Sequence, residues 1–298
     1  MVLMAAMTVS MLTGCETADG KKTEAPSSEN QAAAEVKAED EGKASEGGED
    51  YSYHWKLATT ESSDYYMTQL SQEFLDIVEE KTGGKVTGEV FASGQLGGLV
   101  DALEGLEMGN IDIVMDGVSS LSAVDDIFNV WCLPFLYDNK EHQYRFWDNH
   151  FDEVSDMVAE QSGFRLVSVI DGMNRELAST VPVESMADLK GLKIRVPNIP
   201  GYVRIWECLG AAPIPMSLSE VYTSIQTGVV QGQENDIALT LSLKFYEVAP
   251  YCVMTDHVAY EGSFYFNEEE YQSYPDELKQ IIQEAGEEIK LKSRNMIK

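Results

Sequence analysis

The chain has 298 residues, of which 44% are hydrophobic, so it is long enough for a large core and favours two lobes over one. Its formal net charge is −30. A field of that sign repels nucleic acid and anionic membrane surfaces, so we exclude nucleic acid as a partner. No apolar run after residue 15 reaches the length of a membrane-spanning helix.

The first fifteen residues are similar to a bacterial lipoprotein signal. Residues 1–11 are uncharged and mostly apolar, and Leu12-Thr13-Gly14-Cys15 follows. The resemblance implies that Cys15 carries acyl chains and anchors the protein to a membrane from outside the cytoplasm. The usual basic segment is missing, so we expect the natural start to lie upstream. The alternative is an ordinary apolar N-terminus with a chance Cys.

Residues 16–50 are predicted to form a disordered acidic tether. They contain eleven acidic and four basic side chains and no aromatic residue, and so cannot bury enough apolar surface to fold. Most of the negative charge therefore belongs to residues 51–298. The remaining cysteines, Cys132, Cys208 and Cys252, are too widely spaced to indicate a disulfide framework or a metal site, and their redox state stays open.

From Tyr53 the pattern alternates between strand and helix. A strand over 53–59 precedes Glu61-Ser62-Ser63-Asp64, which offers N-cap residues for a helix that stops at Gly83-Gly84. This alternation predicts a doubly wound α/β lobe. The other elements expected in this half are strands over 85–91, 111–115 and 164–170 and helices over 99–108 and 141–161.

The second half is organised around residues 189–236. Gly232-Gln233-Glu234-Asn235 is interpreted as a polar turn, and the prolines at 213 and 215 suit an edge strand. The final helix has no stop signal, so we expect the chain to be truncated at this end. The elements expected in this half are strands over 175–180, 193–197, 213–215 and 257–266 and helices over 200–209, 219–227 and 275–298.

The sequence contains no motif of an enzyme or a metal site. GxSxG, HExxH and the P-loop are absent, and Gly94-Gln95-Leu96-Gly97-Gly98 is not a dinucleotide-binding GxGxxG. The four His do not stand at ligand spacing with a carboxylate or a Cys. We therefore expect no catalytic residue, no metal and no cofactor.

Two arginines stand out because they lie on predicted strands. Arg195 falls in the apolar strand Lys193-Ile194-Arg195-Val196-Pro197, and Arg175 starts an earlier strand. A buried guanidinium is costly unless an anion pairs with it, and its planar fork suits a carboxylate. Asn235 offers an amide donor and acceptor nearby. The residues alone leave two readings open, an internal Asp or Glu partner or a bound ligand.

From Tyr53 onward the chain resembles the solute-binding subunit of tripartite ATP-independent periplasmic (TRAP) transporters. The motifs that carry the resemblance are LKGLKIRVPN at 189–198, PIPM and SEVY within 213–222, and QTGVVQGQEN at 226–235. They occur in the order and spacing of that family. The resemblance implies an α/β, two-lobe periplasmic-binding-protein-like fold with a hinge and a ligand cleft between the lobes.

The resemblance also implies roles for five residues. Arg195 matches the arginine that forms the principal salt bridge to the ligand carboxylate, and Arg175 matches a second arginine that contacts ligand. Asn235 and Asn198 match ligand-binding asparagines. Leu218 stands where relatives often place an aromatic ring over the ligand, so less stacking is expected here.

Two departures from the family pattern bear on the ligand. Sialate-binding relatives carry an Asp after the Gln-Leu-Gly motif, where this chain has Gly98-Leu99, and this weighs against sialic acid. The usual Pro after the asparagine is Asp236 here. Sugar acids, dicarboxylates, keto acids and aromatic acids all remain open as ligands.

The implied organisation has four parts. Residues 1–15 form the signal segment, 16–50 the tether, 51–171 with 263–298 the first lobe, and 172–262 a second lobe that the expected truncation leaves incomplete. The protein would be an extracytoplasmic, lipid-anchored monomer that captures a carboxylate-bearing organic acid and delivers it to integral-membrane TRAP permease subunits. The alternatives are a ligand sensor for a signalling receptor and, less favoured, a lipoprotein enzyme acting on acidic sugars.

Overall fold

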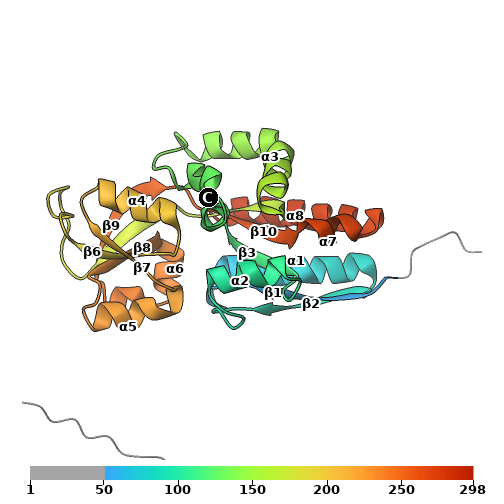
Figure 1. The fold of residues 1–298 in the computed structure, drawn as a ribbon, viewed down its shortest axis with the longest axis horizontal. Coiled ribbons are helices and arrows are strands. Elements are labelled where there is room, and N and C mark those ends of the chain that lie inside the picture. The colour runs from blue at the N-terminus through green and yellow to red at the C-terminus, as the bar shows by residue number, and fades with distance from the viewer. Residues whose placement is uncertain (1–50, 298) are drawn as a thin grey trace, which may run out of the picture. The chain divides into compact units, whose positions relative to one another are not determined.

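A computed structural model describes residues 51–297. The expected lipid attachment at Cys15 and the tether expected over 16–50 lie outside the described residues. Two five-stranded sheets organise the described part, and helices flank each of them (Figure 1). Within residues 51–297, no helix is both long enough and apolar enough to cross a membrane.

The first sheet has the strand order β2-β1-β3-β10-β4. Strands β1, β2 and β3 are parallel, with Tyr53 opposite Val86 and Leu57 opposite Ile113, whereas β10 runs antiparallel to β3 and β4. The strands of this sheet are β1 (Tyr53–Ala58), β2 (Val86–Phe91), β3 (Ile113–Gly117), β4 (Phe164–Asp171) and β10 (Glu261–Asn267).

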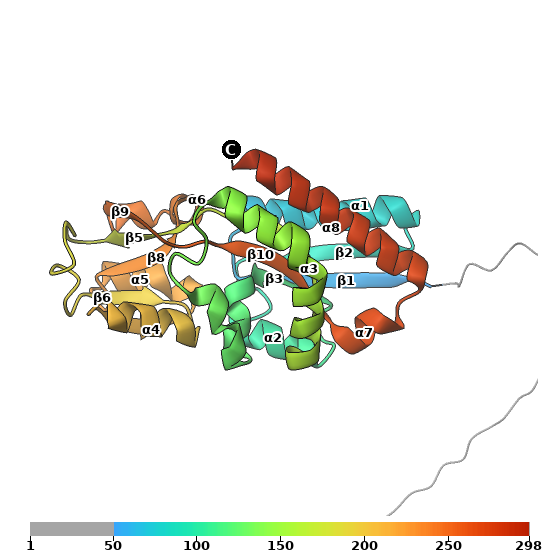
Figure 2. The same ribbon diagram turned by 90° about the horizontal axis from the view of Figure 1, so that it is seen from above.

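Helices cover both faces of the first sheet because its strands carry apolar side chains on both sides. Trp55 and Leu57 of β1 join the core under α1 and α8, while Ala58 joins the core under α2 and α3. Figure 2 shows α1 on one side of the strands and α2 on the other. The helical elements are α1 (Tyr66–Thr82), α2 (Leu99–Glu107), η1 (Val118–Ala123), η2 (Asp126–Cys132), α3 (Lys140–Ser162), α7 (Glu268–Ser273) and α8 (Asp276–Met296).

The second sheet has the strand order β7-β6-β8-β5-β9. Strand β6 is parallel to β7 and β8, and β5 is antiparallel to β8 and β9. Its strands are β5 (Arg175–Ser179), β6 (Lys193–Val196), β7 (Ala212–Pro215), β8 (Gly232–Asp236) and β9 (Tyr251–Val258). Its helices are α4 (Pro200–Cys208), η3 (Leu218–Glu220), α5 (Val221–Gln226), α6 (Ile237–Ser242) and η4 (Phe245–Glu247).

Two segments join the sheets, one between β4 and β5 and one between β9 and β10. These two segments are in close contact at Gly172, where an added Cβ would lie only 2.3 Å from the carbonyl oxygen of Tyr260. The expected single strand over 257–266 is therefore wrong, since it is divided between β9 and β10 at this crossing. The lobe boundaries expected at 171/172 and 262/263 stay a prediction.

The expected polar turn at Gly232–Asn235 is also wrong. These residues form β8, a fully buried strand at the centre of the second sheet. The strand tolerates its polar residues because each has a partner. Gln233 donates to the Thr240 hydroxyl at 3.1 Å, Glu234 accepts from Arg175, and Asp236 accepts from the Leu239 amide at 2.9 Å and the Tyr65 hydroxyl at 2.8 Å.

Candidate functional site

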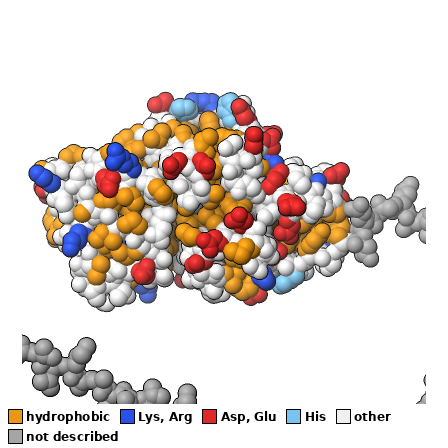
Figure 3. Space-filling model, in the orientation of Figure 1, with side chains coloured by type: hydrophobic (Ala, Val, Ile, Leu, Met, Phe, Trp, Pro, Cys, Tyr) orange, Lys and Arg blue, Asp and Glu red, His pale blue; other side chains and the backbone are white. Residues whose placement is uncertain are grey.

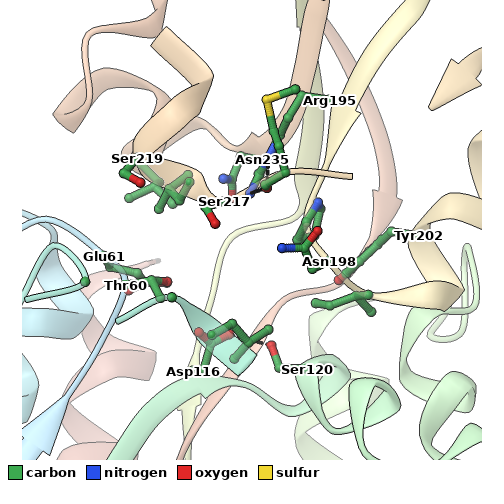
Figure 4. A pocket seen from close by; sticks show the side chains of 18 of the residues that line it. Thr60, Glu61, Asp116, Ser120, Arg195, Asn198, Tyr202, Ser217, Ser219 and Asn235 are labelled. Atoms are coloured by element: carbon green, nitrogen blue, oxygen red, sulfur yellow. Dashed lines mark hydrogen bonds between the residues drawn. The ribbon is translucent and has the colours of Figure 1, made fainter. Parts of the chain in front are cut away.

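A cavity of about 180 Å³ lies between the two sheets, where the parallel strands of both sheets end. Ligands of open α/β sheets bind in this position, at the carboxyl ends of strands. Figure 4 shows residues of the first sheet on one side of the cavity and residues of the second sheet on the other. Thr60, Glu61, Ser93, Leu99, Asp116, Ser119, Ser120 and Tyr260 line the first side, and Arg175, Arg195, Asn198, Tyr202, Met216, Ser217, Leu218, Ser219 and Asn235 the second.

Arg195 is a buried cation that has no ion-pair partner among the described residues. It lies on β6 between two buried apolar residues, with 3% of its surface exposed. Its Nε and Nη2 donate to the main-chain oxygen of Met216 at 3.1 and 2.9 Å. No Asp or Glu within residues 51–297 forms an ion pair with it. Burial lowers the pKa of Arg195 to about 10, so it keeps its charge at neutral pH.

Arg175 has a protein partner. Its Nε and Nη2 donate to the two carboxylate oxygens of Glu234 at 2.6 and 2.8 Å, and Nη2 also donates to the Glu234 carbonyl at 3.0 Å. The guanidinium lies 4.8 Å from the ring centre of Tyr202 and 5.4 Å from that of Tyr260. The sequence left open whether an internal Asp or Glu pairs with each arginine. Among residues 51–297, Arg175 has such a partner and Arg195 does not.

The Arg175 pair fixes the charge of Glu234. Burial alone would raise the pKa of Glu234, but Arg175 and the nearby His257, whose Nε2 lies 3.3 Å away, lower it to about 2. Burial alone would lower the pKa of Arg175, and Glu234 raises it well above the usual arginine value. Both groups are therefore charged at neutral pH, and Glu234 holds Arg175 in place at the cavity wall.

The three other predicted residues also line the cavity. Asn235 is buried at the end of β8, and its Oδ1 accepts from the Asp236 amide at 3.1 Å. Its Nδ2 makes no hydrogen bond to another described residue and stays available to a ligand. Asn198 is exposed in the loop after β6, and Leu218 is half-buried in η3. The structure brings all five residues to one cavity, while their contacts with a ligand remain predictions.

The sequence reasoning missed the acidic side of the cavity. Glu61 follows β1 and Asp116 lies at the end of β3, with 3% and 8% of their surfaces exposed. Glu61 was expected among the N-cap residues of α1, but Tyr65 is the N-cap and no side chain caps it. The signal that could have found both residues is their position at the carboxyl ends of buried strands.

Burial dominates the chemistry of these two carboxyl groups. Burial, then Asp116 and Asp236, raise the pKa of Glu61 well above its usual range. Its Oε1 accepts from the Tyr260 hydroxyl at 3.0 Å. Burial also raises the pKa of Asp116, although hydrogen bonds from the Ser120 hydroxyl and the Gly117 amide oppose this. Residues 51–297 contain no group of three His, Cys, Asp or Glu placed to hold a metal ion.

The chain was compared with known families and proteins. The sequence profile of bacterial extracellular solute-binding protein family 7 (DctP) matches residues 57–298. A solute-binding protein of Roseobacter denitrificans is 37% identical over 178 residues, which cover 59% of this chain and 54% of that protein. This chain therefore spans about half the length of that relative. The sialic acid-binding protein SiaP of Vibrio cholerae is 32% identical over 72% of this chain and 67% of its own length.

The solved structures that resemble this chain are also solute-binding proteins. The Roseobacter protein with bound L-galactonate has a TM-score of 0.78 and 28% identity, over 83% of both chains. A TRAP periplasmic solute-binding protein of Sulfurospirillum deleyianum with bound succinate has a TM-score of 0.76 and 26% identity, over 82% of this chain and 79% of that one. The two-lobe α/β fold expected from the sequence is thereby confirmed.

Proposed function

Because the chain belongs to bacterial extracellular solute-binding protein family 7, we propose that it captures a small organic acid outside the cytoplasm and delivers it to the membrane subunits of a TRAP transporter. The observation that carries the proposal is Arg195, a buried guanidinium that lines a cavity and has no carboxylate partner among residues 51–297. An unpaired buried cation is expensive, and a ligand carboxylate would compensate it.

The ligand carboxylate binds to Arg195 in this proposal. Asn235 donates through its free Nδ2, and Asn198 closes the site from the loop after β6. Arg175 has Glu234 on one edge, but its Nη1 makes no hydrogen bond to a described residue and can serve as a second donor. Leu218 supplies an apolar contact in place of a ring. Each charge-assisted hydrogen bond would contribute about 1.5–3 kcal/mol.

The acidic surface does not oppose an anionic ligand. Figure 3 shows acidic side chains scattered among hydrophobic and uncharged ones over one face of the protein. Their field is screened within about 8 Å at physiological ionic strength, whereas Arg195 acts at contact distance inside the cavity. The acidic exterior would slow the approach of the ligand more than it would weaken the bound state.

Ligand capture would couple to closure of the two sheets around the cavity. Hydrogen bonds already cross between the lobes, among them one from the Tyr65 hydroxyl to Asp236 at 2.8 Å and one between the hydroxyls of Ser119 and Tyr202 at 2.9 Å. A ligand that touches both sides adds contacts that exist only in the closed arrangement, and so shifts the population towards it. The closed surface is what the membrane subunits would recognise.

We also propose that acyl chains on Cys15 hold the protein at the membrane. The apolar run that ends at this Cys supports the proposal. Expressed in a bacterial host, the full chain should partition into the detergent phase of a Triton X-114 extraction, and Cys15→Ser should move it to the aqueous phase. If both forms partition alike, the anchor is wrong.

A thermal-shift screen tests the proposed function. Purified protein is heated with a library of sugar acids, dicarboxylates, keto acids and aromatic acids, together with uncharged sugars as controls. At least one acid should raise the melting temperature, since a ligand at 100 times its Kd stabilises the native state by about 2.7 kcal/mol. NMR should recover that acid unchanged, which separates a receptor from an enzyme. A shift with neutral sugars and with no acid would contradict the proposal.

A further inference from the structure

The two sides of the cavity differ in their ionisable side chains. The lining cations, Arg175 and Arg195, both lie on strands of the second sheet. Among the described residues, the first-sheet side contributes Glu61 and Asp116 and no Lys or Arg. Figure 4 shows Glu61 and Asp116 across the cavity from Arg195 and Asn235. A ligand that reaches from Arg195 to the opposite wall therefore meets carboxyl oxygens at its far end.

Glu61 has an unused acceptor on this wall. The side chain is 3% exposed, and the Tyr260 hydroxyl holds Oε1 at 3.0 Å. Oε2 is buried and has no hydrogen-bond partner among the described residues. A buried acceptor without a partner costs free energy, so a group that donates to it gains more than it would in water. The wall is completed by the hydroxyls of Thr60, Ser119 and Ser120.

The chemistry of the far end of the ligand follows from this wall. A hydroxyl group brings its own proton and can donate to Glu61 or Asp116. A second carboxylate brings a negative charge to a buried wall of carboxyl groups, and no described residue that lines this side is a cation that could compensate it. An apolar or aromatic tail would leave the Glu61 oxygen unpaired, and sites built to bind a hydroxyl reject such analogues strongly.

We propose that Glu61, together with Asp116, forms a hydroxyl-recognising subsite, so that this chain selects a polyhydroxylated monocarboxylate over a dicarboxylate. The proposal rests on the proposed function, since it takes Arg195 as the carboxylate anchor. It assigns the cavity two ends, a carboxylate end at Arg195 and a polyol end at Glu61.

Isothermal titration calorimetry at neutral pH tests the subsite with matched probes. The polyhydroxylated acids are galactonate, gluconate, galacturonate and glucuronate, and the competitors are succinate, adipate and hexanoate. Wild-type protein should bind at least one polyhydroxylated acid about 100-fold or more tighter than any competitor, since one charge-assisted hydrogen bond alone is worth about tenfold to a hundredfold. A dicarboxylate that binds as tightly as the best sugar acid overturns the proposal.

Glu61→Gln keeps the shape of the side chain and replaces one carboxyl oxygen, an acceptor, with an amide group that donates. It should weaken the best sugar acid by about tenfold and narrow the preference over adipate. Asp116→Asn should act in the same direction, and Glu89→Gln, the same substitution at an exposed position of β2, should leave both affinities unchanged. Unfolding curves of each variant establish that it folds. An unchanged preference in folded Glu61→Gln and Asp116→Asn overturns the subsite.

The outcomes separate this inference from the proposed function. If a dicarboxylate binds best and Arg195→Ala abolishes its binding, the subsite is wrong and the carboxylate receptor stands. If no acid binds, and whatever does bind is unaffected by Arg195→Ala, both the subsite and the carboxylate receptor are wrong.

Discussion

The guanidinium of Arg195 donates two hydrogen bonds to the main-chain oxygen of Met216, and to no carboxylate of the described chain. A carbonyl dipole orients the side chain, but it does not neutralise a full charge in a buried site. Arg175, which lines the same cavity, has the opposite arrangement, with a bidentate carboxylate partner in Glu234. Arg175 is therefore fixed by a partner within the protein, whereas Arg195 has no carboxylate partner among residues 51–297, and for this reason we propose Arg195 as the anchor for an external anion.

The Arg175–Glu234 pair should be required for stability. Glu234→Ala leaves Arg175 buried without its carboxylate and should lower the free energy of unfolding by about 3–5 kcal/mol. Chemical denaturation measures this loss. Glu207→Ala, which removes an exposed partner of Arg204, should change it little. Equal effects of the two substitutions would show that the buried pair has no special role.

The acidic wall should make stability depend on pH. Burial and neighbouring carboxylates raise the pKa of Glu61, and burial raises that of Asp116. Between the ordinary carboxyl pKa of about 4 and these raised values, the folded state binds more protons than the unfolded state. These two groups should therefore raise stability as the pH falls from neutral towards about 5. Glu234, whose pKa is about 2, has the opposite effect: its contribution to stability is lost as the pH falls, and only below about pH 4.5.

Melting temperatures measured from pH 8 to pH 5 isolate the Glu61 contribution. Glu61→Gln should flatten the pH dependence relative to wild type, because one group with a raised pKa is removed. Glu89→Gln controls for the loss of one negative charge at the surface. The same pH profile in wild type and Glu61→Gln would contradict the account.

Gly201 controls how closely α4 approaches the first lobe. A Cβ at this position would lie 2.5 Å from the Cβ and Sγ of Cys132 in η2 and 2.8 Å from Oδ1 of Asn129. Gly201→Ala should therefore cost about 1–3 kcal/mol of overpacking, seen as a lower denaturation midpoint and weaker ligand binding. Adding Cys132→Ala should recover part of the loss because it removes Sγ. If Gly201→Ala alone is as stable as wild type, there is no tight contact between α4 and η2 at this position.

Much of this site could be predicted from the sequence, because three ordered motifs mark the loops and strands that hold Arg195, Asn198, Leu218 and Asn235. The β8 strand could not be predicted in this way. Its polar residues give no strand signal, and they are buried only because partners such as Thr240 and Tyr65 come from other elements.

The partner of Arg175 and the acidic wall were missed for a related reason. Arg175 reaches Glu234 because β5 and β8 pair antiparallel, 59 residues apart in the chain. Glu61 precedes two serines and an aspartate, and such a segment is typical of a helix N-cap. Glu61 is buried in part by Tyr260, which lies 199 residues away in the chain and donates to it. A single sequence gives residue spacing, whereas these pairs depend on tertiary contacts.

The central claim is that Arg195 anchors a ligand carboxylate, and calorimetric titration of Arg195→Ala tests it most directly. The titrant is the acid that gives the largest thermal shift with wild-type protein, and Arg204→Ala, an exposed arginine of α4, is the control. We predict that Arg195→Ala weakens binding by about 100-fold or more, as expected for two charge-assisted hydrogen bonds, and that Arg204→Ala does not. Binding by folded Arg195→Ala as tight as that of Arg204→Ala would contradict the claim.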